Sequence, residues 1–233
     1  MALNIETFKT RAITALVFVV IMLSGILING YLFIALSLTI MLGCLYEFFK
    51  MYQIIYSKKD IKLVWSSLLY IILPIIILLG LGCSYSFKSL IINNKYQSYI
   101  PCLIFFSIWI NDTMAYMVGS FIGKTPFSKI SPKKTWEGTI GGVILCVLII
   151  HLGTEFIFHD SQNLFRNTII AAICGIFGTF GDLLESKLKR MANIKDSGSI
   201  MPGHGGFLDR FDSLLLALPA VFLYQLIFSI FSR

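Results

Sequence analysis

Long apolar runs recur along the whole of this 233-residue chain, and they constrain its fold more than any other feature. Seven such runs lie at about residues 12–28, 31–50, 63–82, 99–122, 139–158, 168–186 and 212–231. About 20 apolar residues cross the hydrocarbon of a bilayer as an α-helix, and a helix satisfies its own backbone polar groups in lipid. The sequence therefore predicts an all-α, polytopic integral membrane protein with about seven transmembrane helices and short cytoplasmic loops.

The composition supports this class and argues against a soluble protein. Apolar residues make up 57% of the chain and charged residues 13%, whereas a soluble domain carries about 25% charged residues. The net charge of +7 suits a protein that works beside anionic lipid headgroups or on anionic substrates. Because no basic face with interleaved aromatic residues is present, we expect no nucleic-acid partner. The five cysteines have no metal-site or redox spacing, so free thiols are expected.

The basic residues predict how the chain is oriented in the membrane. With the N-terminus in the cytoplasm, 15 of the 19 lysine and arginine residues flank the helices on the cytoplasmic side. The first apolar run is interpreted as a membrane helix and not as a signal peptide, since no polar mature region follows it. No linker or internal repeat is visible, so residues 1–233 are expected to form a single membrane-embedded catalytic domain. Its N-terminal helices extend to about residue 100, and residues 101–233 carry the motifs.

A first motif, W-I-N-D-T-M-A-Y at Trp109–Tyr116, places a carboxylate deep in an apolar run. A carboxylate within the bilayer is costly, so Asp112 requires a partner or a water-filled cavity. Two interpretations stay open. In the first, Asp112 forms a structural hydrogen bond between helices. In the second, Asp112 lies on the same helix face as Tyr116 and Gly119 and holds the residues of a site in position.

A second motif, S-P-K-K-T-W-E-G at Ser131–Gly138, precedes a predicted helix in a cytoplasmic loop. Two lysines and two hydroxyl groups beside a helix start are suited to binding an anion. The alternative is an ordinary basic flank of a membrane helix, which explains Lys133 and Lys134 but not the cluster from Thr135 to Glu137. The nearby G-S-F-I-G-K-T at Gly119–Thr125 is one residue too short for a phosphate-binding P-loop and follows a membrane helix. We expect Gly119 and Gly123 to allow two helices to approach closely instead.

The third stretch is a polar stripe on the sixth apolar run, continued by a loop rich in glycine and charge. Gly175, Gly178 and Gly181 thin one side of the helix, and Asp182, Glu185, Ser186 and Lys189 share one face. Beyond them follow Lys195, Asp196, the His204-Gly205-Gly206 turn, and Asp209 and Asp212 one helical turn apart. Carboxylate oxygens with so little His or Cys favour Mg²⁺ over zinc. Metal, basic residues and glycines together are suited to binding a polyphosphate.

These residues resemble those of a known family. Ser186–Asp212 resembles the signature of phosphatidate cytidylyltransferases (CDP-diacylglycerol synthases), and N-D-T-x-A-Y and S-P-K-K-T-W-E-G are similar to two further motifs of that family in the same order. The match covers about Trp109 to Ser213. The chain is shorter than typical members, and Met114 stands where the family usually has a small residue. The resemblance implies a Mg²⁺-dependent nucleotidyltransferase of phospholipid biosynthesis that transfers CMP from CTP to phosphatidate, giving CDP-diacylglycerol and pyrophosphate.

The resemblance and the charge types together assign roles to individual residues. The expected catalytic residues are Asp182, Asp209, Lys195 and Asp196, and the expected metal ligands are Asp182, Asp209 and Asp212. The expected substrate-binding residues are Ser131, Lys133, Lys134, Thr135, Lys189, Arg190, His204, Gly205, Gly206 and Arg210. Asp112, Glu137 and Glu185 are expected to lie next to these residues and to hold them in position. The expected cofactor is Mg²⁺, as two cations, and a monovalent cation stays open. No role follows for Glu47, a further carboxylate within an apolar run.

Two other classes stay open. A CDP-alcohol phosphotransferase would also use Mg²⁺ and clustered carboxylates, but its D-x-x-D-G motif is not met because Ser213 follows Asp212. An ion-coupled transporter could use Asp112, Asp182 and Glu185, although the paired broken helices typical of that class are not visible. The partners expected on the enzyme interpretation are CTP, phosphatidate, membrane lipids and, as an open alternative, a second copy of the chain. The expected location is an inner or plasma membrane of bacterial type, with the active site facing the cytoplasm.

Overall fold

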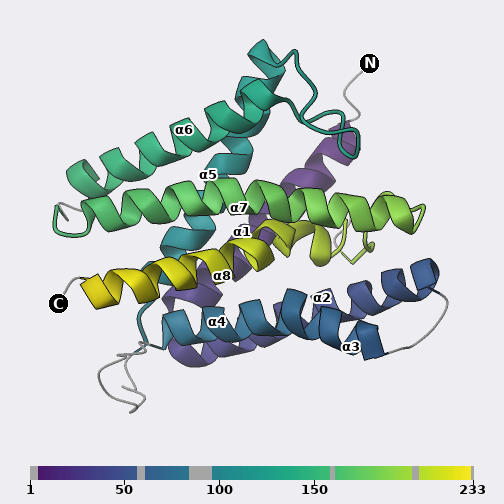
Figure 1. Cartoon of the computed structure of the whole chain (residues 1–233), viewed down its shortest axis with the longest axis horizontal. Coiled ribbons are helices and arrows are strands. Elements are labelled where there is room, and N and C mark those ends of the chain that lie inside the picture. The colour runs from purple at the N-terminus through teal and green to yellow at the C-terminus, as the bar shows by residue number, and fades with distance from the viewer. Residues whose placement is uncertain (1–4, 57–60, 84–95, 158–160, 201–204, 232–233) are drawn as a thin grey trace. The chain divides into compact units, whose positions relative to one another are not determined.

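A computed structural model describes residues 5–56, 61–83, 96–157, 161–200 and 205–231. The regular elements in these ranges are helical, and Pro126 and Thr135 form an isolated antiparallel β-bridge. In chain order the elements are α1 (Ile5–Leu27), α2 (Gly30–Tyr56), α3 (Ile61–Ser67), the π-helical turn η1 (Leu68–Ile72), α4 (Leu73–Gly82), α5 (Tyr99–Ile122), α6 (Trp136–Leu152), the π-helical turn η2 (Gly153–Ile157), α7 (Leu164–Met191) and α8 (Leu208–Phe231) (Figure 1).

Six stretches of the described residues are long and apolar enough to cross a membrane. They are Gly30–Tyr56, Lys62–Gly82, Tyr99–Ile122, Trp136–Phe156, Leu164–Met191 and Leu208–Phe231, and the apolar part of α1, Ala12–Leu27, is shorter. Each of the seven predicted apolar runs thus falls mainly within helical structure. The prediction of an all-α, polytopic membrane protein is confirmed. The π-helical turn η1 comes just before Pro74, which lies in the first turn of α4, where a missing backbone N–H is tolerated.

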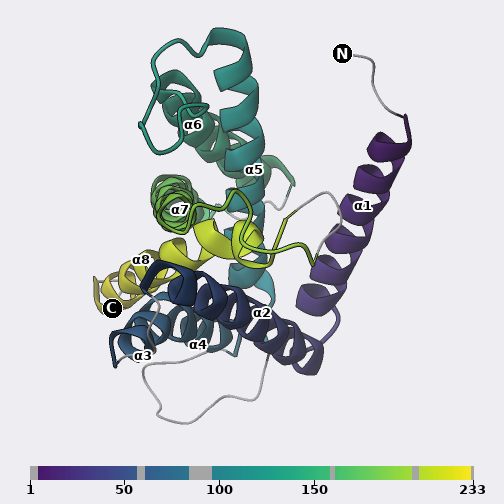
Figure 2. The ribbon, with the colours of Figure 1, turned by 90° about the vertical axis from the view of Figure 1, so that its right-hand side faces the viewer.

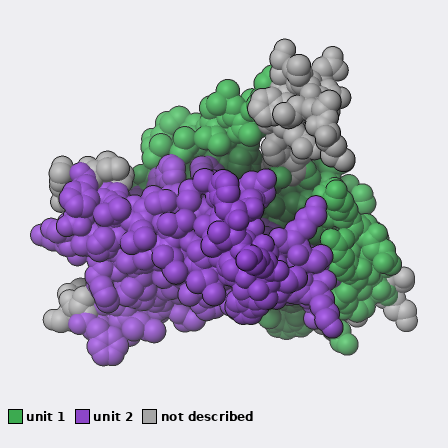
Figure 3. Space-filling model, turned by 90° about the horizontal axis from the view of Figure 1, so that it is seen from above, with its two compact units in different colours: residues 1–98, 188–211 green, residues 99–187, 212–233 purple. Residues whose placement is uncertain are grey.

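The chain divides into two compact units, coloured separately in Figure 3. Unit 1 comprises residues 1–98 and 188–211, and unit 2 comprises residues 99–187 and 212–233. One boundary lies just before α5, and the other two fall within α7 and α8, so each of these two helices contributes to both units.

In unit 1, helix α2 is the central element, and α1, α3, η1 and α4 all contact it. Figure 2 shows α2, α3 and α4 lying together. Phe33, Ile40, Cys44 and Met51 of α2 are at most 2% exposed and recur at the helical period, so one face of the helix is buried. A Cβ atom at Gly82 of α4 would collide with the ring of Phe33, which shows how closely the two helices pack.

In unit 2, helices α5 and α6 pack closely through small residues. A Cβ atom at Gly138 would lie 2.8 Å from the carbonyl oxygen of Ala115 and 2.9 Å from the Cα atom of Gly119. A Cβ atom at Gly142 would lie 2.7 Å from that of Ala115. The expectation that Gly119 lies at a close helix contact is therefore confirmed. Close approach through small residues is typical of membrane helices, whose association depends on van der Waals packing.

Helix α7 uses its glycines in the same way within unit 2. A Cβ atom at Gly175 would lie 3.0 Å from Oδ1 of Asn111 on α5, and one at Gly178 would lie 3.4 Å from the Cβ atom of Ser213 on α8. A Cβ atom at Gly181 would collide with the backbone carbonyl oxygen of Asp212. Gly178 and Gly181 thus allow the polar end of α7 to pack against the first turns of α8, and this contact lies beside the predicted site residues Asp182 and Asp212.

Candidate active site

In unit 2, Asp182 of α7 forms an ion pair with Lys134, which precedes α6. The other oxygen of Asp182, Oδ1, accepts a hydrogen bond from the hydroxyl of Ser186 one turn later, at 3.2 Å. The side chains of Lys134 and Asp182 are 29% and 32% exposed, so solvent and solutes reach both groups. A cationic group and an anionic group that were predicted from separate motifs therefore lie side by side.

A second carboxylate of unit 2, that of Asp212 in the first turns of α8, is 7% exposed. Its Oδ1 accepts a hydrogen bond from the backbone N–H of Ser213 at 2.6 Å. The charges of Asp182, Asp112 and Lys134 all act on Asp212, so the electrostatic environment of this carboxylate combines two anionic neighbours with one cationic neighbour. The Nδ2 atom of Asn111 lies 3.5 Å from Oδ1 of Asp112. Unit 2 thus collects carboxylates from α5, α7 and α8 near one lysine.

The remaining residues of the S-P-K-K-T-W-E-G motif order the loop in front of α6. Oγ1 of Thr135 accepts a hydrogen bond from the backbone N–H of Gly138 at 3.1 Å, so Thr135 is the N-cap of the helix. Glu137 accepts a hydrogen bond from the hydroxyl of Thr125 at 2.8 Å and from the backbone N–H of Lys124 at 3.2 Å. These bonds show a structural contribution of Thr135 and Glu137. Lys133 is exposed on the same loop.

The segment that joins α7 to α8, residues 192–207, belongs to unit 1 and is called the signature loop below. Near its start lies Asn193, whose backbone is in the left-handed conformation. Asn193 has a φ of +54°, its N–H donates to the carbonyl of Arg190 at 3.1 Å, and the N–H of Ile194 donates to that of Lys189 at 3.0 Å. This pair of bonds is a Schellman motif, which ends the helix and turns the chain. Arg190, Lys195 and Asp196 are exposed around this turn.

Asp209, in the first turn of α8, accepts hydrogen bonds from a lysine and from backbone N–H groups of unit 1. Its Oδ1 accepts from Nζ of Lys189 at 2.7 Å, and its Oδ2 accepts from the backbone N–H of Ser197 at 2.9 Å and of Gly206 at 2.8 Å. The side chains of Lys189 and Asp209 are 14% and 10% exposed. Gly205 has a φ of +81°, and a Cβ atom there would collide with the Asp209 carboxylate, so two separate constraints require glycine.

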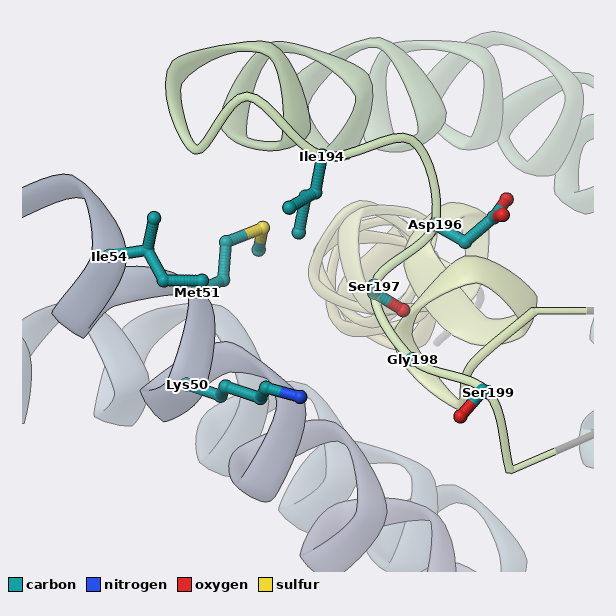
Figure 4. Close-up of a pocket in the computed structure, with 8 residues that line it drawn as sticks. All are labelled: Lys50, Met51, Ile54, Ile194, Asp196, Ser197, Gly198 and Ser199. Carbon is teal, nitrogen blue, oxygen red and sulfur yellow. The ribbon is translucent and has the colours of Figure 1, made fainter.

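A pocket of about 270 Å³ opens in unit 1 between the C-terminal part of α2 and the signature loop. Figure 4 shows Lys50 extending from α2 toward the 197–199 segment, whereas Ile194 points toward Met51. The lining residues are Lys50, Met51, Ile54, Ile194, Asp196, Ser197, Gly198 and Ser199. Lys50 was not among the predicted site residues, because the motifs lie elsewhere and it stands at the end of an otherwise apolar run.

The structure places the other predicted residues as follows. Glu185 of α7 is fully buried, Arg210 of α8 is exposed, and the backbone oxygen of Ser131 accepts from the N–H of Lys134 at 3.1 Å. His204 lies outside the described residues. Asp182 and Asp212 belong to unit 2 and Asp209 to unit 1. Among the described residues, no group of three or more His, Cys, Asp or Glu side chains is placed so that it could hold a metal ion. The assigned roles of all these residues stay predictions.

One buried carboxylate had no role in the sequence analysis. Glu47 of α2 is 1% exposed and accepts hydrogen bonds from the signature loop and from the first residue of α8. Its position within an apolar run was the signal that could have identified it, because a charged group within a membrane segment requires partners.

The sequence of this chain is similar to one protein family and to several curated enzymes. The sequence model of a family described as "Cytidylyltransferase family" matches residues 58–228. The phosphatidate cytidylyltransferase of Staphylococcus haemolyticus is 47% identical over 116 residues, which are 49% of this chain and 44% of that protein. The enzyme of that name from Staphylococcus aureus is 45% identical with the same coverage. Phosphatidate cytidylyltransferase 4, chloroplastic, of Arabidopsis thaliana is 47% identical over 117 residues, which are 50% of this chain and 30% of that protein. The matches thus span less than half of the length of these curated relatives.

Proposed function

Because the chain belongs to the cytidylyltransferase family, we propose that it transfers CMP from CTP to phosphatidate, forming CDP-diacylglycerol and releasing pyrophosphate. The observation that carries the proposal lies in unit 2, where Lys134 forms an ion pair with Asp182, and the charges of Lys134, Asp182 and Asp112 act on Asp212. Clustered carboxylates beside a lysine suit a reaction between two phosphates, since such a site can hold a divalent cation and neutralise phosphate charge.

The proposed reaction is a direct displacement at phosphorus. An oxygen of the phosphatidate phosphate attacks the α-phosphorus of CTP, and the bond from that phosphorus to the oxygen bridging the α- and β-phosphates breaks. The electron pair leaves with pyrophosphate. Since the attacking phosphate is already ionised near neutral pH, no general base is required. The barrier comes from bringing two anions together, so catalysis consists of positioning and charge neutralisation.

The carboxylate side chains of unit 2 are of the chemical type that binds a magnesium ion. Mg²⁺ prefers oxygen ligands and is usually held by one or two carboxylates, with water and substrate phosphates completing its shell. We assign Asp182 and Asp212 to this role, with Asp112 as a further carboxylate whose charge acts on Asp212. Bound there, Mg²⁺ would neutralise charge on the triphosphate. So small a number of protein ligands is compatible with the finding that no group of three lies among the described residues. We also propose a second cation and a role for Asp209 as a metal ligand, but we assign no geometry to either.

The basic residues would bind the substrate phosphates. Lys134 already contacts a carboxylate of the cluster and is partly exposed, so its ammonium group can bind a phosphate beside the metal. Lys133 is exposed on the same loop and is assigned to CTP. We further propose that the site faces the cytoplasm, where CTP is available, that the N-terminus lies on the same side, and that the phosphatidate headgroup enters from the membrane surface.

The proposal is tested with purified protein in detergent or in vesicles. Pyrophosphate release should require CTP, phosphatidate and Mg²⁺ together, and diacylglycerol in place of phosphatidate should give none. Asp182→Asn should lower turnover strongly. The matched control is Glu155→Gln, which alters an exposed carboxylate at the opposite end of α6 and η2 and should leave turnover unchanged. Wild-type protein that binds both substrates but releases no pyrophosphate would contradict the proposal.

A further inference from the structure

Glu47 connects a membrane helix to the signature loop within unit 1. Its Oε2 accepts hydrogen bonds from the hydroxyl of Ser197 at 2.6 Å and from the backbone N–H of Leu208 at 2.9 Å. Its Oε1 accepts one from the backbone N–H of Phe207 at 3.0 Å. The side chain is 1% exposed, so these protein donors replace the water that a carboxylate loses on burial.

The arrangement of donors is specific for a carboxylate. Each oxygen of Glu47 faces a backbone N–H, and a backbone N–H can only donate. A glutamine amide would place its NH₂ group against one of these two donors in either orientation. The N–H of Phe207 or of Leu208 would then be buried without an acceptor, at the start of α8, where the first N–H groups have no partner inside the helix. Glu47 of α2 thus provides the hydrogen-bond acceptor at the start of α8 that the side chain of an N-cap residue usually provides.

Two glycines of the loop adapt it to this carboxylate. A Cβ atom at Gly198 or at Gly206 would collide with the carboxylate oxygens of Glu47. The loop therefore passes Glu47 at two points with its bare backbone, and the close approach depends on both partners. Glycine at these positions is explained by contact with Glu47, without any need for an unusual backbone angle.

Ser197 relays the position of Glu47 to Asp209. Its hydroxyl donates to Glu47 and accepts from the backbone N–H of Asp209 at 3.3 Å, while its own N–H donates to Oδ2 of Asp209 at 2.9 Å. Asp209 in turn holds Lys189 through Oδ1. Ser197 and Gly198 also line the pocket that Lys50, one turn beyond Glu47 on α2, shares with the loop (Figure 4). A continuous set of hydrogen bonds therefore runs from a membrane helix to the charged groups that flank the signature loop.

We propose that Glu47 is a positioning residue, which fixes the signature loop on α2 and thereby orients Asp209 and Lys189 for the reaction. It need not touch substrate. This inference rests on the proposed function for its effect on turnover, but its structural part stands without it. A displacement of about 1 Å at a reacting centre can cost roughly a hundredfold in rate, and we expect Glu47→Gln to lower kcat by about that factor. Glu47→Asp, which keeps two acceptor oxygens on a shorter side chain, should lose less.

Limited trypsin digestion gives a readout that does not depend on activity. Arg190 and Lys195 are exposed cleavage sites beside and within the loop. Loss of one buried hydrogen bond corresponds to roughly tenfold more frequent opening, so Glu47→Gln should speed cleavage at these sites about tenfold. Ser37→Ala is the matched control, because Ser37 is equally buried on α2 and makes no side-chain hydrogen bond to another described residue. It should change neither turnover nor cleavage.

Wild-type kcat together with wild-type trypsin resistance in Glu47→Gln would overturn the inference. Should that variant fail to insert into the membrane, Ser197→Ala decides, because it removes a single hydroxyl of the relay. Faster cleavage and lower kcat in Ser197→Ala support the inference, and unchanged values overturn it. If the wild-type protein releases no pyrophosphate from CTP and phosphatidate, the proposed function fails, whereas the digestion still shows whether Glu47 holds the loop.

Discussion

Replacing Asp209 with asparagine tests the charge arrangement of unit 1 most directly. The amide oxygen of the new side chain can keep the two hydrogen bonds from the backbone N–H groups of Ser197 and Gly206, but its NH₂ group then faces the ammonium of Lys189. Both charged side chains of the native pair are largely buried, at 14% and 10% exposure. Removing one partner of a buried ion pair costs about 3–5 kcal/mol, because the other charge is left uncompensated. Since Lys189 can turn partly toward solvent, we expect the lower end, about 3 kcal/mol.

The expected cost is measurable as a loss of thermal stability. For a chain of this size about 1 kcal/mol shifts the Tm by roughly 2–4 °C, so Asp209→Asn should lower the Tm by roughly 6–12 °C. Cys146 and Cys174 carry buried thiols, so a thiol-reactive fluorescent dye reports unfolding in detergent. The control is the double variant Asp209→Asn with Lys189→Met, which removes both charges of the pair. It should recover at least half of the lost Tm.

Two results would refute this reasoning. A Tm of Asp209→Asn within about 2 °C of the wild type would mean that Lys189 finds another partner at no cost. A double variant no more stable than the single one would mean that the backbone hydrogen bonds of Asp209, and not its ion pair, carry the energy. Turnover separates the structural role from the chemical one: we expect both variants to lose nearly all activity, because neither keeps the Asp209 carboxylate.

Three further predictions concern unit 2. Lys134→Ala should change stability by no more than about 1 kcal/mol, because its ion pair is partly exposed, yet it should lower pyrophosphate release at least about tenfold; a loss of Tm without loss of turnover would contradict the assignment. Lys133→Ala should raise the KM for CTP several-fold and leave that for phosphatidate unchanged; the reverse pattern would assign the loop to the lipid. Gly138→Ala should cost about 1–3 kcal/mol, since its Cβ would meet backbone atoms of α5 at 2.8 and 2.9 Å. Gly153→Ala, with nothing within 4 Å, is the control that should keep the wild-type Tm.

The helical architecture could be predicted because a bilayer leaves few alternatives for a long apolar run. The ends of the helices were less predictable. Helix α2 continues to Tyr56, beyond the predicted end at residue 50, since Met51 and Tyr52 extend its buried face. The π-helical turns were not predicted either, because a one-residue change of helical hydrogen bonding leaves the hydropathy pattern intact. By contrast, the close contact at Gly119 followed from the sequence, since small residues at helical spacing have few other uses in membrane helices.

The candidate site was predictable where its residues lie close together in the sequence. Lys189 and Asp209 are part of one charged stretch, and the structure brings them into contact. Asp209 and Asp212 lie one helical turn apart and were both predicted to be metal ligands, but their partners differ. Lys189 and loop N–H groups contact Asp209, whereas the charges of Asp182 and Asp112 act on Asp212. Glu47 could not be assigned, because its partners lie 150 to 161 positions away along the chain. Hydropathy shows that a buried carboxylate needs partners, but not which loop crosses its helix.

The hydrogen bonds of Glu47 and Asp209 differ in kind from those of Asp182. Glu47 and Asp209 each accept from at least two backbone N–H groups, and such acceptors hold a loop in place because the donors cannot turn away. Asp182 is about a third exposed, and its recorded partners are the side chains of Lys134 and Ser186, both of which can reorient when a cation or a phosphate arrives. A metal ligand has to exchange partners on binding, whereas a positioning residue must not. Substitution of Asp182 should therefore raise the Mg²⁺ concentration needed for half-maximal turnover, and substitution of Glu47 should lower kcat at any Mg²⁺ concentration.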